Sequence, residues 1–136
     1  MNVAIVTLIL SIAVEVGIPP NFALAVALTE NPELNPKAVN VNEDGSRDLG
    51  LMQLNSSWYH GDWEHPETNI MAACIHIKWL MNRVATQTLW DVAIAYNYGY
   101  ANFVTKKPPD DVLDYAAKVM NKYEELNGKP VNPLIR

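Results

Sequence analysis

The chain has 136 residues, of which 49% are hydrophobic and 18% charged, a composition typical of one packed globular domain and not of a disordered segment. Its net charge is −5 and its longest basic run is Lys106-Lys107, so the basic surface of a nucleic-acid-binding protein is excluded. The single cysteine, Cys74, excludes an intrachain disulfide, and its apolar neighbours at helical spacing indicate a buried thiol.

The first predicted element is an apolar helix over about residues 3–17, which Gly17 closes. Residues 3–14 are apolar except for Thr7 and Ser11, but this run is too short to span a membrane. No Lys or Arg precedes it, and Glu15 interrupts the place where a cleavage site would follow. We therefore expect a buried first helix, no stable membrane insertion and no export signal of the chain's own, with a targeting segment as the alternative.

A second helix is predicted over about residues 21–30, starting at Asn21 or at the two preceding prolines. It must end near Asn31, because Pro32 disfavours the helical conformation in the residue before it. Residues 31–50 are rich in Asn, Pro, Asp, Gly and Ser, which predicts a loop with at most one short helix near 35–39. A loop of this length in a compact domain is usually functional.

Three further helices follow. A stripe of apolar residues at three- and four-residue spacing predicts a helix within 66–85; its members are Ile70, Cys74, Ile77, Met81 and Val84. Residues 88–98 are apolar nearly all round, which places their helix in the middle of the domain. Asp110 or Asp111 is predicted to cap a last long helix that Gly128 ends. Trp79 and Trp90 fall on these helices and are expected in the core.

No run of β-branched residues alternates with polar ones, so the predicted fold class is all-α. We expect one domain spanning residues 1–136, with about five to seven helices, a core over about 3–126 and an extended C-terminal tail over 127–136.

Glu30 is the residue that carries the most chemical information. It sits at the C-terminal end of an apolar helix, where the negative end of the helix dipole disfavours an ionised carboxylate. Burial against an apolar wall would disfavour ionisation further, and both effects raise the pKa. A glycosidase general acid needs such a raised pKa. The alternative on composition alone is a solvated Glu at a helix end.

Several short blocks resemble one enzyme family when they are read in chain order. They are Thr29-Glu30-Asn31 with Leu34-Asn35-Pro36-Lys37-Ala38, Gly50-Leu51-Met52-Gln53-Leu54, Ala95-Tyr96-Asn97-Tyr98-Gly99 and Tyr115-Ala116-Ala117-Lys118-Val119. In order and rough spacing they resemble the motifs of soluble lytic transglycosylases, in the lysozyme-like superfamily, from about residue 8 to residue 125. The resemblance implies a lysozyme-like helical domain with a substrate groove.

The resemblance also implies a role for each matching residue. Glu30 would be the catalytic acid and base, and Tyr96 would lie close to it and orient either it or the leaving oxygen. The other implied substrate-binding positions are Gln53 and the backbone near Met52 for the sugar N-acetyl groups, Asn40 near the cleaved linkage, and Asn97, which would also tie loops together. Tyr98 and Tyr100 follow the Tyr96 block and are candidates to line the groove, with plain packing as the alternative, because aromatic faces suit both.

The chain departs from the family pattern at four places. Asn31 replaces a serine, Pro32 adds one residue to the following loop, and Asn55 stands where many members have methionine. Arg47-Asp48 replaces a plainer run and brings this block closer to the small transglycosylases of secretion and conjugation systems and of phages. The Asn31 and Asn40 roles depend on this reshaped loop.

The implied reaction is cleavage of the MurNAc–GlcNAc β-1,4 bond in peptidoglycan glycan strands, with formation of 1,6-anhydroMurNAc. A lysozyme-type hydrolase is the alternative, and it would need a second carboxylate, for which Asp48 and Asp44 are the candidates. A glycan-binding module without activity and a structural module of an envelope or virion machine also remain open. The charge of peptidoglycan lies mostly on lactyl and peptide carboxylates, so affinity must come from close contacts in a groove.

No cofactor and no metal are expected. His60 and His65 with the intervening Asp62 and Glu64 imitate a metal cluster, but the interleaved Trp58, Tyr59 and Trp63 favour a sugar-stacking or plain surface loop. The chain is expected to be a monomer that acts on the cell wall, in the periplasm, outside the cell or carried by a phage.

Overall fold

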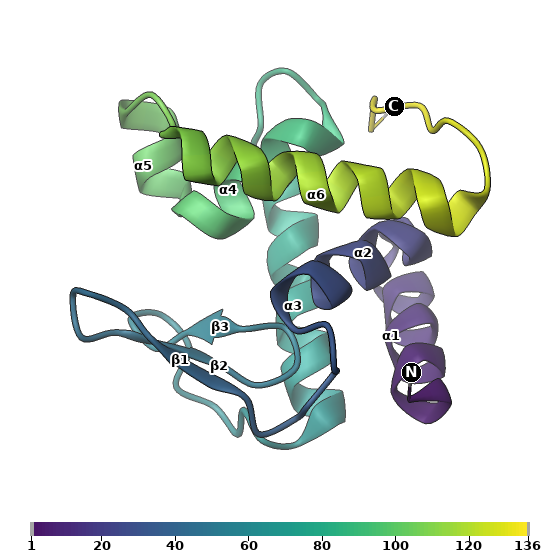
Figure 1. The fold of residues 1–136 in the computed structure, drawn as a ribbon, viewed down its shortest axis with the longest axis vertical. Helices are drawn as coiled ribbons and strands as arrows, with labels where there is room; N and C mark the ends of the chain where they lie inside the picture. The colour runs from purple at the N-terminus through teal and green to yellow at the C-terminus, as the bar shows by residue number, and fades with distance from the viewer. Residues whose placement is uncertain (1, 136) are drawn as a thin grey trace.

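The computed structural model describes residues 2–135 and consists mainly of helices (Figure 1). The helices are α1 (Val3–Val16), α2 (Pro20–Glu30), α3 (Pro66–Met81), α4 (Leu89–Tyr98), α5 (Tyr100–Thr105) and α6 (Asp110–Asn127). Three short strands form an antiparallel sheet in the order β1 (Val39–Val41), β2 (Arg47–Leu49) and β3 (Leu54–Asn55). The mostly helical fold expected from the sequence is confirmed.

Helix α2 is the central element of the core. All residues from Phe22 to Ala27 are buried, so this helix is enclosed on every side, as its uniformly apolar sequence requires. It packs against α1 and α6, and Phe22 meets the ring of Tyr123 edge to face. Pro20 occupies the first turn, where its missing N–H costs nothing, and Asn31 ends the helix. Glu30 is therefore held at the C-terminal end of a buried helix.

Helix α1 is less buried than its composition suggests. Only Ile9, Ile12 and Ala13 are buried, whereas Val3 and Val14 are exposed. The prediction of a buried first helix is therefore wrong for one face, because a small domain packs an outer helix from one side only. Gly17 ends the helix in the left-handed conformation, as predicted, and no described helix is long and apolar enough to cross a membrane.

The later helices follow their patterns with three corrections. Asp110 and Asp111 stand in the first turn of α6 and not at its cap, which is Pro109. Helix α5 had no sequence prediction because its six residues carry no apolar period. Trp79 is 38% exposed, so its expected place in the core is wrong, while Trp90 is partly buried.

Residues 31–50, which the sequence predicted as loop with at most a short helix near 35–39, contain β1 and β2 instead. Val39 pairs with Leu49 and Val41 with Arg47. The chain reverses between the strands at Gly45, whose φ of 84° lies in the left-handed region. Strands of two or three residues are too short to display a period of two, so the sequence pattern did not reveal them.

The C-terminal tail is attached to the connection between α3 and α4. Leu134 forms an antiparallel bridge with Thr88, the N–H of Leu89 donates to the carbonyl of Pro133 (2.8 Å), and the N–H of Ile135 donates to that of Gln87 (2.9 Å). The tail is extended, as expected, but these hydrogen bonds hold it against the domain.

Candidate active site

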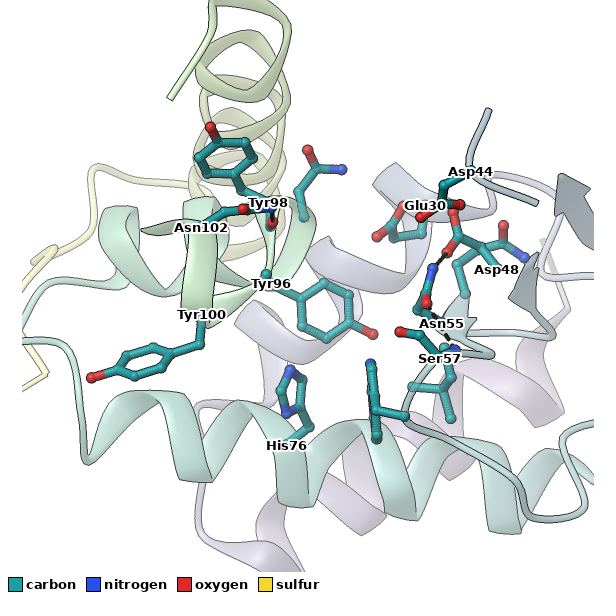
Figure 2. Close-up of a pocket in the computed structure, with 15 residues that line it drawn as sticks. Glu30, Asp44, Asp48, Asn55, Ser57, His76, Tyr96, Tyr98, Tyr100 and Asn102 are labelled. Carbon is teal, nitrogen blue, oxygen red and sulfur yellow. Dashed lines mark hydrogen bonds between the residues drawn. The ribbon is translucent and has the colours of Figure 1, made fainter. Parts of the chain in front are cut away.

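A pocket of about 320 Å³ opens where the end of α2 faces the small sheet, α3 and α4 (Figure 2). Its wall on the sheet side carries mainly polar residues, and its helical wall is rich in aromatic rings. The lining residues are Glu30, Asp44, Asp48, Gln53, Leu54, Asn55, Ser57, Trp58, His76, Tyr96, Asn97, Tyr98, Gly99, Tyr100 and Asn102. Glu30 is thus brought together with Gln53, Tyr96, Asn97, Tyr98 and Asp48.

A raised pKa keeps the carboxyl of Glu30 mostly protonated at neutral pH, although the residue remains partly exposed in the pocket. Burial is the main cause that raises its pKa from 4.5 to about 8. The hydrogen bond from Tyr115 lowers this pKa, and the charge of Asp48 raises it. A protonated carboxyl that a ligand can still reach is what a general acid requires.

The phenol that holds Glu30 belongs to Tyr115 and not to Tyr96. The hydroxyl of Tyr115, on the inner face of α6, donates to Oε2 of Glu30 at 3.2 Å. Burial and the charge of Glu30 hold the pKa of Tyr115 well above its usual range, so this phenol stays a donor. From the sequence, Tyr115 is only the first residue of the closing family block, with no role assigned to it, so this contact with Glu30 was missed.

Tyr96 lies close enough to Glu30 for the two to interact electrostatically, but its hydroxyl donates to the carbonyl of Met52 at 2.6 Å. The N–H of Met52 in turn donates to Oδ1 of Asn69 at 2.9 Å. Both peptide groups of Met52 are therefore occupied within the protein, and its side chain is fully buried. The implied contact between the backbone near Met52 and a sugar N-acetyl group stays a prediction.

Gln53 and Asn40 are bonded to each other. Nδ2 of Asn40 donates to Oε1 of Gln53 at 2.6 Å, and Nε2 of Gln53 donates to the carbonyl of Gly50 at 2.9 Å. Gln53 thereby closes the tight turn after β2, while Asn40 is exposed and lies outside the pocket lining. At Gly50 a Cβ would approach Nδ2 of Asn69 to within 2.4 Å, so this turn has no room for a side chain there. The amide of Gln53 acts first as a structural clamp.

Asn31 has a similar structural role. Its side chain accepts the N–H of Asn35 (3.2 Å) and donates to the carbonyl of the same residue (2.8 Å). These two bonds shape the lengthened loop after Pro32.

Asp48 faces the same space as Glu30 from the sheet side, as Figure 2 shows. Nδ2 of Asn55 donates to Oδ1 of Asp48 at 2.9 Å and to the hydroxyl of Ser46 at 3.1 Å, which fixes the direction of the Asp48 carboxylate. Asp44 bonds instead to Ser46 in the hairpin turn, and these bonds lower its pKa. Of the two acids considered in this loop, Asp48 is the one whose charge acts on Glu30.

Three aromatic side chains and one amide complete the pocket on its helical side. Tyr98 and Tyr100 line it, and the side chain of Asn97 is exposed at its rim, with no hydrogen bond to another loop within residues 2–135. His76 was not predicted. The centroid of its ring stands 4.7 Å from that of Trp58, and burial lowers the pKa of His76, which favours the uncharged ring. Nothing in the helical pattern of α3 distinguished His76 from a packing residue.

Cys74, by contrast, is part of the core. Its side chain is fully buried, as predicted, and burial raises the pKa of its thiol to about 12. It lies outside the pocket lining and offers no nucleophile to it.

Comparison with models of known families matches residues 7–116 to the transglycosylase SLT domain. No curated protein matches the chain. The family match covers most of the sequence, including Glu30, the sheet, the aromatic wall and Tyr115. The chain therefore belongs to the transglycosylase SLT domain family, whose members have a lysozyme-like, mostly helical fold and act on peptidoglycan.

Proposed function

We propose that the chain is an active lytic transglycosylase that cleaves the β-1,4 bond between MurNAc and GlcNAc. The observation that supports this most is the carboxyl of Glu30, which has a pKa of about 8, opens into a pocket and accepts a hydrogen bond from Tyr115. Such a group is protonated at neutral pH and can give its proton to a glycosidic oxygen.

In the proposed reaction Glu30 first protonates the glycosidic oxygen, and the bond from that oxygen to C1 of MurNAc breaks. The 2-acetamido carbonyl of MurNAc stabilises the positive charge that develops at C1. Glu30, now ionised, takes the proton of the MurNAc C6 hydroxyl, whose oxygen forms the new bond to C1. The product is a 1,6-anhydro sugar, no water is consumed, and Glu30 ends protonated as it began.

The two neighbours of Glu30 suit the two states of this cycle. Tyr115 donates to a carboxylate oxygen, so it stabilises the ionised form that accepts the C6 proton. Asp48 raises the pKa and so favours the protonated form that starts the reaction. In the proposed reaction the Asp48 carboxylate, which Asn55 holds at the pocket wall, would also stabilise positive charge at C1.

The second candidate function is hydrolysis of the same bond, and Asp48 is the observation that favours it. A hydrolase uses a second carboxylate either to activate a water or to form a covalent glycosyl intermediate. Asp48 lines the same pocket as Glu30 and is held by Asn55. Under this alternative the C6 hydroxyl would take no part in the reaction.

The products distinguish the two reactions. Purified sacculi are digested with the full chain, and the released muropeptides are analysed by mass spectrometry. The proposal predicts anhydro ends, which lack one water relative to hydrolytic products. Reducing ends would establish the hydrolase instead. Release of nothing beyond what a Glu30→Gln variant releases would leave a glycan-binding module without activity. The site of action that follows from this substrate is the cell wall.

A further inference from the structure

A row of planar side chains leads away from the pocket along α3. His76 meets Trp58 on one side and, nearly in parallel, Trp79 on the other, with 5.9 Å between the centroids of His76 and Trp79. Tyr100 contacts the edge of Trp79, with 5.1 Å between centroids. Trp58, His76 and Tyr100 line the pocket, whereas Trp79 lies beyond its lining. The row is therefore continuous with the pocket.

The row ends in a positive charge. The guanidinium carbon of Arg83 lies 3.9 Å from the centre of the Trp79 ring, and Nη1 of Arg83 donates to the carbonyl of Trp79 at 3.4 Å. Arg83 is exposed, and within residues 2–135 no carboxylate lies at ion-pair distance from it. The indole thus holds the orientation of a cation that is free to meet an external anion.

The charge of the side chains changes from negative in the pocket to positive at Arg83, where the row ends. The pocket itself is lined by the acidic residues Glu30, Asp44 and Asp48, and none of its lining residues is Lys or Arg. Trp58 and Trp79 are 45% and 38% exposed, so each presents part of its indole ring to solvent beside the pocket. A strand that carries a carboxylate away from the reacting bond would find uncharged rings first and Arg83 next.

We propose that Trp79 and Arg83 form a distal subsite that binds the part of the glycan strand continuing beyond the pocket. Trp79 supplies an apolar contact to a sugar ring, and Arg83 pairs with a lactyl carboxylate of MurNAc. This subsite rests on the proposed function only in that the occupant is a peptidoglycan strand. It makes affinity depend on strand length and on carboxylates away from the reacting bond.

The test measures binding by NMR titration to the full chain carrying Glu30→Gln, which keeps the ligand uncleaved. The probes are a peptide-free GlcNAc–MurNAc disaccharide, the corresponding octasaccharide and an octasaccharide of GlcNAc alone. Trp79→Ala and Arg83→Gln are added to that background. The matched controls are Ile75→Ala, which removes an exposed apolar residue of the same helix outside the pocket lining, and Lys129→Gln, which removes one positive charge beyond α6.

We expect Trp79→Ala to weaken binding of both octasaccharides about tenfold and to leave the disaccharide unchanged. Arg83→Gln should weaken the MurNAc-containing octasaccharide roughly threefold, and the effect should disappear at high salt and with the GlcNAc octasaccharide. The two controls should change neither ligand. Equal affinity of Trp79→Ala and its parent for all probes would overturn the subsite, as would a loss of the same size for disaccharide and octasaccharide.

Failure of the proposed function would be recognised separately. If the octasaccharide dependence is present but the parent chain with Glu30 intact releases nothing from sacculi, the subsite stands and the enzymatic proposal falls. If sacculi are cleaved but neither Trp79 nor Arg83 affects binding, the enzyme stands and the subsite falls.

Discussion

The two walls of the pocket influence Glu30 in different ways. On the helical side, formed by α2, α3 and α4, the carboxyl is buried, and Tyr115 reaches it from α6 with one phenol. The sheet wall is polar and partly exposed, and it offers the carboxylate of Asp48, held by Asn55. Burial dominates the pKa of Glu30, and the two side chains adjust it in opposite directions. Burial therefore determines the protonation state of Glu30, while the hydrogen bond from Tyr115 and the charge of Asp48 adjust its pKa.

The largest expected effect comes from removing the group that both walls surround. Glu30→Gln keeps the shape of the side chain but has no proton to give, so cleavage of sacculi should fall by roughly 10²–10⁴-fold. Turbidity of a sacculus suspension measures the rate, and Glu33→Gln, at an exposed acid in the following loop, is the matched control. A Glu30→Gln variant with full activity would show that the acid lies elsewhere.

Asn69 tests what holds the sheet wall to the helical one. It is fully buried on α3, accepts the N–H of Met52 and donates to the carbonyls of Leu49 and Trp63, both at 3.0 Å. Asn69→Ala leaves these buried groups unpaired and should reduce the free energy of unfolding by about 3 kcal/mol. Urea denaturation measures the change, and Asn82→Ala at the exposed end of the same helix should alter it little. Equal stability of the two variants would mean that the hydrogen bonds of Asn69 do not hold the sheet wall to the helices.

The pH dependence of stability tests the burial of Glu30 directly. Because its pKa is raised from 4.5 to about 8 on folding, the folded state binds more protons than the unfolded state between these values. The stability contribution is complete below pH 4.5 and is lost as pH rises toward 8. Glu30→Gln abolishes this loss. The full shift corresponds to about 5 kcal/mol, and because Glu30 is partly exposed to solvent we expect the variant to exceed the parent by on the order of 2 kcal/mol at the alkaline end. Thermal unfolding of the parent and of Glu30→Gln is measured across this pH range. Parallel curves of stability against pH for the two proteins would contradict the burial of Glu30.

The smallest effects separate the two walls. Tyr115→Phe removes the hydrogen bond that lowers the pKa of Glu30, so this pKa should rise. Asp48→Asn removes the charge that raises it, so the pKa should fall. Titration of the Glu30 carboxyl by carbon NMR measures both, and the alkaline limb of kcat/KM should move in the same two directions. If both variants shifted the pKa of Glu30 in the same direction, the opposite contributions of Tyr115 and Asp48 would be contradicted.

Local signals in the sequence determined a large part of this architecture. Pro20, Gly17 and Gly128 set helix ends through their own backbone preferences. The apolar stripe located α3, and the nearly all-apolar run over 88–98 located α4. Glu30 at the end of an apolar helix already predicted a raised pKa, because dipole and burial act through neighbouring residues. The family motifs indicated the soluble lytic transglycosylases, and the match to the transglycosylase SLT domain over residues 7–116 confirms that family.

The tertiary structure decided how these residues meet. Tyr115 bonds Glu30 across a separation of 85 residues, and the choice between it and Tyr96 depends on how α6 crosses α2. Strands of two or three residues form only because a hairpin and Asn69 hold them, and the peptide groups of Met52 are occupied by partners from α3 and α4. Sequence patterns record the preferences of neighbours along the chain, whereas a pocket is made from contacts between distant segments, whose pairing is settled only when the core packs.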